Sequence, residues 1–124
     1  MKQDIVEYFF QMVKIDSESG NEKEFLTFLS HLFEKELNAS SKFDNHGNLI
    51  IKIDAKNSNK KKPVLFCCHG DTVNPGQGIV PVLKDGIITS QSDTILGADD
   101  KAGIAEILVA LKNAPKYPPV EIVI

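Results

Sequence analysis

Four residues in two short stretches of the chain have the chemistry of a divalent metal site. His69 and Asp71 directly follow the apolar run Val64–Cys68, and Asp99 and Asp100 directly precede a strongly apolar helical pattern. Residues i and i+2 of a strand project to the same side, so the His69 and Asp71 side chains can point into one site. Imidazole nitrogens and carboxylate oxygens are common zinc ligands in hydrolytic enzymes. The sequence therefore predicts a divalent metal bound where these elements end.

The members of this set are expected to have different roles. His69 can bind a metal through one ring nitrogen while Asp71 accepts a hydrogen bond from the other and fixes the tautomer. Asp99 has two oxygens, enough to bridge two metal ions, and it lies where a helix presents its positive end. Taken singly, each residue could equally be a turn or helix-cap residue. The presence of both motifs, in this order and with a predicted hairpin between them, favours the metal site.

Strand and helix patterns alternate along the chain, which predicts an α/β fold with helices packed on both faces of a sheet. The run Val64–Cys68 is expected to be a strand buried on both faces. The Asp-Gly pair at 85–86 predicts a hairpin over Val82–Ile88. The remaining predicted elements are helices over residues 1–14, 25–37 and 101–113, and strands near Phe43, over Leu49–Ile53 and over Val120–Ile124.

Two loops are expected to have local roles. In the turn-rich segment 16–21, Ser19 with Glu22, or Asn21 with Glu24, is expected to cap the following helix, because an N-cap oxygen accepts a hydrogen bond from an unpaired backbone N–H. Residues 74–78 are rich in glycine and follow the predicted site directly, so this flexible segment could shape a substrate pocket.

Composition and charge restrict the function classes. The chain has 124 residues, enough for one domain or part of one, and its formal net charge of −3 gives no support to nucleic-acid binding. The basic run Lys60–Lys62 lies in a polar loop and is expected to be solvated. No apolar run reaches the length of a membrane span, and the first residues lack the apolar stretch of a signal peptide. These features predict a protein that binds neither nucleic acid nor membrane.

The cysteines and the other two histidines are expected to lie outside the site. Cys67 and Cys68 are adjacent on a predicted strand, so they face opposite sides and cannot easily pair. Free thiols without a disulfide framework suggest the cytoplasm, and both thiols are expected to pack in the core rather than to react. His31 lies off the apolar stripe of its helix, and His46 lies in an Asn-His-Gly-Asn turn, so neither is expected to bind a metal.

Two motifs resemble those of one known family. They are Phe66-Cys-Cys-His-Gly-Asp-Thr-Val73 and Thr94-Ile-Leu-Gly-Ala-Asp-Asp-Lys-Ala-Gly-Ile-Ala105, and the segment Lys14-Ile-Asp-Ser-Glu-Ser-Gly-Asn-Glu22 extends the likeness to nearly the whole chain. The sequence resembles the N-terminal part of the catalytic domain of the di-zinc metallopeptidase family that includes peptidase T, carboxypeptidase G, aminoacylase and acetylornithine deacetylase. The peptidase T-like branch, which contains tripeptide aminopeptidases, is the most similar.

The resemblance implies a three-layer α/β/α catalytic domain that binds two zinc ions. It implies that His69 is a ligand of one zinc, that Asp71 orients His69, and that Asp99 bridges the two ions. Asp100 is implied to follow a cis peptide bond and to be structural rather than a ligand. The implied partner is a small peptide substrate, which the enzyme would cleave from its free amino end with a zinc-activated water.

Other parts of the family's machinery have no counterpart in residues 1–124. The family's Glu-Glu pair, which supplies a general base and a ligand, is not matched by Glu121, which lies inside a predicted strand. A further acidic ligand, a distant histidine and a lid domain are also not matched. The chain is therefore expected to be the N-terminal part of the catalytic domain, with the lid and the C-terminal half absent. Alone it is expected to be inactive and, through its open sheet edge, to form homo-oligomers.

Two alternatives remain open. A related di-zinc aminopeptidase or an N-acyl-amino-acid deacylase would share His69 and Asp99, since the parts that select the substrate are not in this sequence. A protein of another class, a catalytically inactive module that binds a partner through an unfinished sheet, would keep the fold without the chemistry. Zinc-dependent activity that appears once the missing part is supplied would exclude the inactive module.

Overall fold

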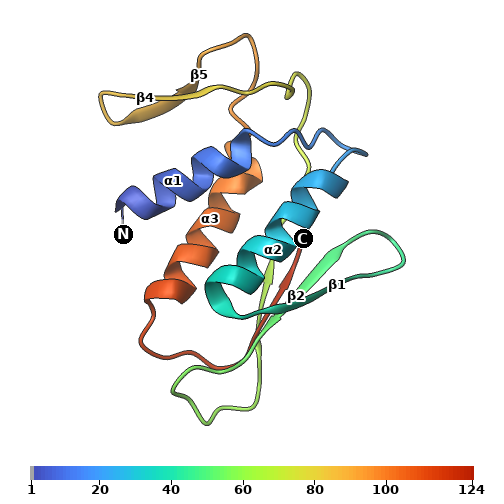
Figure 1. Ribbon diagram of the computed structural model, residues 1–124, viewed down its shortest axis with the longest axis vertical. Coiled ribbons are helices and arrows are strands. Elements are labelled where there is room, and N and C mark those ends of the chain that lie inside the picture. Colours follow the sequence, from blue (N-terminus) through green and yellow to red (C-terminus); the bar gives the residue numbers. More distant parts are fainter. Residues whose placement is uncertain (1) are drawn as a thin grey trace.

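The computed structural model describes residues 2–124 and contains a mixed four-stranded sheet (Figure 1). The strands are β1 (Ser40–Phe43), β2 (Leu49–Ile53), β3 (Val64–Cys67), β4 (Pro81–Lys84), β5 (Ile87–Ser90) and β6 (Val120–Val123), and the helices are α1 (Lys2–Val13), α2 (Lys23–Leu37) and α3 (Ala98–Asn113). The strands of the sheet lie in the order β1-β2-β6-β3, with β6 parallel to β3 and the other neighbours antiparallel. A separate hairpin, β4 and β5, lies beside α1 and the start of α3.

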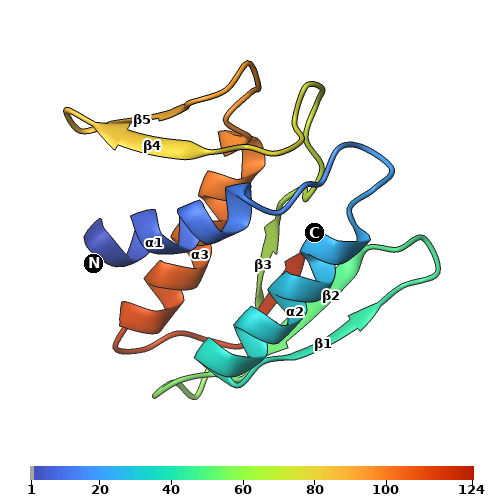
Figure 2. The same ribbon diagram turned by 45° about the horizontal axis from the view of Figure 1, so that its top comes forward.

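The three helices of residues 2–124 cover one face of this sheet (Figures 1 and 2). Alternate residues of β2 point to opposite faces, so Leu49, Ile51 and Ile53 are buried against the helices whereas Lys52 is exposed on the other face. The α/β class predicted from the sequence is confirmed. The second helical layer of the expected α/β/α arrangement, however, is not formed by the described residues.

Strand β3 lies at an edge of the sheet, and the prediction that it is buried on both faces is wrong. The side chain of Val64 is 42% exposed and that of Leu65 is 58% exposed. The apolar run correctly predicted a strand, but such a run does not reveal which strands lie beside it or what covers its second face. Cys67 is exposed and Cys68 is half-buried, so the core packing expected for Cys67 is also wrong. Both thiols are free, as predicted.

The hairpin and the third helix follow the sequence prediction. The β4–β5 turn places Asp85 and Gly86 at φ values of 51° and 80°, the left-handed conformations that an Asp-Gly turn favours. The apolar face of α3 is buried, with Ile104 and Leu108 in the core. No helix within residues 2–124 is long and apolar enough to cross a membrane.

The predicted cap of α2 is not formed. The residue that precedes the helix is Glu22, and its side chain makes no capping hydrogen bond to the first turn. Ser19 instead donates a hydrogen bond to Asp71, which lies far along the chain. Sequence spacing suggested a local partner for Ser19, whereas the tertiary fold gives it a distant one.

Candidate metal centre

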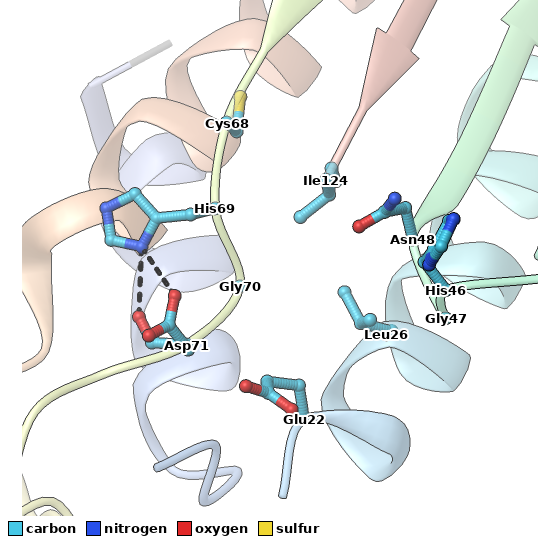
Figure 3. Close-up of a pocket in the computed structure, with 10 residues that line it drawn as sticks. All are labelled: Glu22, Leu26, His46, Gly47, Asn48, Cys68, His69, Gly70, Asp71 and Ile124. Atoms are coloured by element: carbon cyan, nitrogen blue, oxygen red, sulfur yellow. Dashed lines mark hydrogen bonds and ion pairs between the residues drawn. The ribbon is translucent and has the colours of Figure 1, made fainter. Parts of the chain in front are cut away.

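The three residues predicted to form the site meet at one end of the sheet, where the loop after β3 approaches the start of α3. The Nδ1 atom of His69 lies 3.1 Å from both the Oδ1 atom and the backbone oxygen of Asp71. The Nε2 atom on the opposite side of the ring lies 3.0 Å from the Oδ1 atom of Asp99. Figure 3 shows the two contacts from His69 to Asp71. The structure therefore brings His69, Asp71 and Asp99 together as the sequence predicted, while their chemical roles stay predictions.

The surroundings of His69 favour its protonated form when no metal is bound. Both ring nitrogens face oxygens that can only accept hydrogen bonds, so a proton on each nitrogen satisfies all of these contacts. The hydrogen bond to Asp99 is the main cause of a raised pKa for His69; the contacts with Asp71 also raise the pKa, and burial opposes them. The carboxylate of Asp99 is almost fully exposed, so this side of the site is open to a solvent ion.

Asp71 is itself held by Ser19, which the sequence analysis had assigned to a helix cap. The Ser19 hydroxyl donates to the Oδ2 atom of Asp71 at 2.5 Å, which leaves Oδ1 for His69. This hydrogen bond from Ser19 is the main cause of a lowered pKa for Asp71. The two residues are 52 positions apart, so no local pattern pointed to the contact. Only the family likeness of segment 14–22 gave a signal that this loop belongs to the site.

The glycine-rich loop after the site is anchored to the same N-terminal segment (Figure 2). Glu18 accepts hydrogen bonds from the Gly76 amide at 2.8 Å and from the Gln77 side chain at 2.9 Å, and Asp16 accepts one from the Gly78 amide at 2.8 Å. A side chain at Gly76 would lie 2.9 Å from Thr72 and from the backbone of the preceding turn, too close for any carbon atom. This close approach requires glycine.

The start of α3 has an irregular backbone at the two adjacent carboxylates. The peptide bond from Asp99 to Asp100 is cis, as the family resemblance implied. Both residues have non-helical dihedral angles, so the regular helix begins at Lys101. A side chain at Gly103 would collide with the carboxylate of Asp100, which therefore lies over the first turn of the helix. This position is compatible with a structural rather than a ligating Asp100.

Lys101 is a buried residue of the site region that sequence reasoning did not single out. Its side chain is 1% exposed, its Nζ atom donates to the backbone oxygen of Ile15 at 2.7 Å, and the ammonium lies 4.4 Å from the centre of the Phe25 ring. Burial lowers the pKa of Lys101 to about 8, while the charge of Asp16 acts in the opposite direction. A lysine in the first turn of a helix is ordinarily solvated, so the sequence held no signal for its burial.

A cavity of about 260 Å³ lies beside His69 (Figure 3). The turn that carries His46 forms the wall opposite His69 and Asp71, and Ile124 lies between the two walls. Cys68 also lines this cavity. Its pKa is raised to about 11, mainly by burial and further by Asp100, so the thiol stays protonated at neutral pH. The exclusion of His46 and Cys68 from the site stays a prediction.

The donor atoms fit a zinc ion, although they do not complete a site. Nitrogen and oxygen ligands at zinc distances of about 2.0–2.2 Å in tetrahedral geometry lie roughly 3.4 Å apart. The 3.0 Å between His69 Nε2 and Asp99 Oδ1 is close to that separation. Within residues 2–124, no group of three or more histidine, cysteine or acidic side chains is arranged to hold a metal ion. The chain thus places two possible donor atoms at a separation that suits one metal ion, with Asp71 hydrogen-bonded to the other side of the His69 ring.

Comparison of the fold with solved structures gives the class of protein. The chain matches the aminopeptidase PepT from Bacillus cereus ATCC 10987 with a TM-score of 0.87 and 34% identity, covering 99% of this chain and 36% of that one. A metallo-carboxypeptidase of the M20 family from Sulfolobus solfataricus shares the fold with a TM-score of 0.71 and 19% identity, covering 97% of this chain and 30% of that one. The fold is that of a metallopeptidase catalytic domain.

Sequence comparison narrows the class. Peptidase T from Shouchella clausii (strain KSM-K16) is 30% identical, covering 98% of this chain and 40% of that protein. The uncharacterized protein YqjE from Bacillus subtilis (strain 168) is 37% identical, covering 87% of this chain and 30% of that protein. No protein-family model matches the chain. The chain is therefore a homologue of peptidase T, and it spans about 40% of the length of the peptidase T relative.

Proposed function

We propose that the chain is the N-terminal part, residues 1–124, of the catalytic domain of a zinc-dependent aminopeptidase that hydrolyses small peptides. His69 and Asp99 would be metal ligands, with Asp99 bridging two ions, and Asp71 would orient His69. The observation that carries the proposal is the position of the His69 ring, which has Nδ1 held by Asp71 and Nε2 directed at Asp99. The homology to peptidase T supports the reaction class.

The residues of this chain would prepare one side of the active site. Asp71 keeps a proton on Nδ1 of His69, so the lone pair of the neutral ring lies on Nε2. Ser19 occupies the second oxygen of Asp71 and prevents that carboxylate from turning away. Asp99 presents an exposed carboxylate beside Nε2. Bound zinc would supply the Lewis acidity and the lowered water pKa that peptide hydrolysis needs.

We expect the 124 residues alone to be inactive. Two ligands hold zinc weakly, and the family's general base is not matched by any residue of this sequence. The substrate would be a small peptide, and the free thiols favour a cytoplasmic enzyme.

We also expect the chain to self-associate through β3. Among residues 2–124, no strand pairs with the outer edge of β3, and Leu65 is largely exposed there. Such an edge is a template for pairing with a second copy. Leu65→Lys should lower the apparent mass measured by light scattering toward that of a monomer, whereas Lys42→Glu on β1 should not. A wild-type chain that is monomeric at high concentration would contradict this expectation.

A chimera tests the proposed function. The 124 residues would replace the matching part of the Bacillus cereus aminopeptidase, and hydrolysis of tripeptides would be measured with zinc and after chelation. We expect zinc-dependent cleavage that His69→Ala abolishes and that His46→Ala leaves intact. Because the parts that select the substrate come from the Bacillus cereus protein, the chimera tests the metal site and not the choice between peptides and N-acyl amino acids. A folded chimera with no hydrolytic activity would support the inactive binding module.

A further inference from the structure

We propose that Lys101 is a positioning residue for the metal centre. It ties the helix that begins after Asp99 to the N-terminal segment that holds Asp71, and so sets the two carboxylates on opposite sides of the His69 ring. The inference rests on the proposed function for its chemical meaning. It concerns contacts that do not themselves involve a metal.

The first step is the contact from α3 to the N-terminal segment. Lys101 follows Asp99 by two residues, and its Nζ atom donates to the Ile15 backbone oxygen at 2.7 Å. The Phe25 ring, 4.4 Å from the ammonium, covers it from the side of α2. The first regular residue of α3 is thereby fixed to the chain directly after α1.

The second step leads from Ile15 to the site. Residues 17–19 pair with the loop after β3: the Thr72 amide donates to the Ser17 oxygen at 2.9 Å, and the Ser19 amide donates to the Thr72 oxygen at 3.1 Å. The Ser19 hydroxyl then holds Asp71. Five residues of continuous chain, 15–19, therefore connect the Lys101 contact to the carboxylate that orients His69.

The third step is energetic. Lys101 lies on the buried face of α3 with Ile104 and Leu108, at a position where an apolar side chain would extend the core. An ammonium there loses its hydration and gains one carbonyl and one aromatic face in return, so burial alone does not favour lysine. The segment it anchors also buries the Ser17 hydroxyl, which has no hydrogen-bond partner in the described structure. Neither the buried Lys101 ammonium nor the unpaired Ser17 hydroxyl is expected to raise the free energy of unfolding. Both are typical of a segment whose position matters for a functional site.

The test compares three variants of the 124-residue chain. Lys101→Met keeps the stem but removes the donor, and Lys101→Arg restores a cationic donor. Lys112→Met removes a lysine from the other end of the same helix as the matched control. The readouts are zinc affinity by titration and hydrogen exchange of the Ser19 and Thr72 amides, which join the N-terminal segment to the loop after β3.

We expect Lys101→Met to weaken zinc binding by about tenfold, the usual effect of losing support around a ligand, and to speed exchange of the Ser19 and Thr72 amides by about tenfold. Lys101→Arg should recover both, and Lys112→Met should change neither. A Lys101→Met chain that keeps the wild-type zinc affinity and amide exchange would overturn the proposal. If the wild-type chain binds no zinc, the proposed metal role fails, while the exchange of these amides still decides the role of Lys101.

Hydrogen exchange of the wild-type chain decides the case in which Lys101→Met does not fold. If Lys101 couples the segment to the helix, the Ser19 and Thr72 amides should be protected within about tenfold of the Ala105 amide in α3. Exchange at Ser19 and Thr72 that is about a hundredfold faster than at Ala105 would show that the segment opens independently, and would overturn the proposal.

Discussion

The two ends of helix α3 hold a lysine in opposite ways. At the C-terminal end, Lys112 is partly exposed, donates to the Tyr8 hydroxyl at 2.5 Å and pairs with the carboxylate of Glu36. That pairing raises the pKa of Lys112 to about 12. At the N-terminal end, Lys101 is almost completely buried, has a backbone carbonyl as its acceptor, and has its pKa lowered to about 8 by burial. One helix therefore carries an ammonium paired with a carboxylate at one end and a buried ammonium bonded to a backbone carbonyl at the other.

The difference separates a stabilising contact from a positioning contact. The Lys112 end ties three helices together with ordinary charge pairing. The Lys101 end has an irregular backbone at Asp99 and Asp100, an exposed carboxylate, and a buried ammonium. Departures from local rules that cluster at one place are typical of functional sites. The following predictions test this comparison.

The largest expected effect is on the pH dependence of stability. Between about pH 8 and 10.5, Lys101 is deprotonated in the folded chain and still protonated in the unfolded one. The unfolded state then binds more protons, so the free energy of unfolding rises with pH across this window. The rise is on the order of 3 kcal/mol. Urea unfolding at several pH values in a chelator should show a rise that Lys101→Met removes and Lys112→Met retains. Identical profiles for all three chains would contradict the burial of a titrating Lys101.

The next effect concerns the metal. His69→Ala should weaken zinc binding by roughly a hundredfold, about 2.7 kcal/mol, because it removes a ligand. The His69 side chain is about half exposed, so the free energy of unfolding should change by less than about 1 kcal/mol. Titration calorimetry with zinc measures the first quantity and urea unfolding the second. His46→Ala is the control, and equal loss of affinity in both variants would count against the ligand assignment.

A smaller effect is expected from the residue behind Asp71. Ser19→Ala removes the hydroxyl that holds Asp71, so the pKa of Asp71 should rise and zinc affinity should fall by about tenfold. Ser30→Ala, which breaks a 2.6 Å hydroxyl pair with Ser41 away from the site, is the matched control. The two variants are compared by zinc titration, and an unchanged affinity in Ser19→Ala would mean that Asp71 is oriented without Ser19.

The smallest effect is expected at the C-terminal end of α3. In Glu36→Gln, Lys112 is still partly exposed and can bond to water. The free energy of unfolding should therefore fall by about 1 kcal/mol or less. Glu34→Gln on the exposed side of α2 is the control. Urea unfolding of both variants measures the difference in their free energies of unfolding. A loss of unfolding free energy in Glu36→Gln several times larger than this would contradict the view that the Lys112 contact contributes only modestly.

Local patterns in the sequence were sufficient to predict the elements and the proximity of His69, Asp71 and Asp99. The helical periodicities, the Asp-Gly hairpin and the meeting of His69, Asp71 and Asp99 were all predicted, because each depends on residues close together in the chain or on motifs at the ends of elements. The structure confirms these placements.

What the sequence could not predict depends on contacts between distant residues. Strand β3 lies at the sheet edge because β6, from the end of the chain, inserts between β2 and β3. The contacts of Ser19 with Asp71 and of Lys101 with Ile15 span 52 and 86 positions. A serine before a helix favours a cap and a lysine in a first turn favours solvent, so in both cases the local preference pointed away from the contact that forms.

The central claim is that His69 and Asp99 bind the same metal ion. Anomalous diffraction at the zinc edge, from crystals of the chain grown with zinc, tests it directly. We expect a zinc peak within bonding distance of the Nε2 atom of His69 and the carboxylate of Asp99, with Asp71 still on Nδ1. Zinc bound only at His31 or His46, or no ordered zinc in the crystal, would contradict the claim.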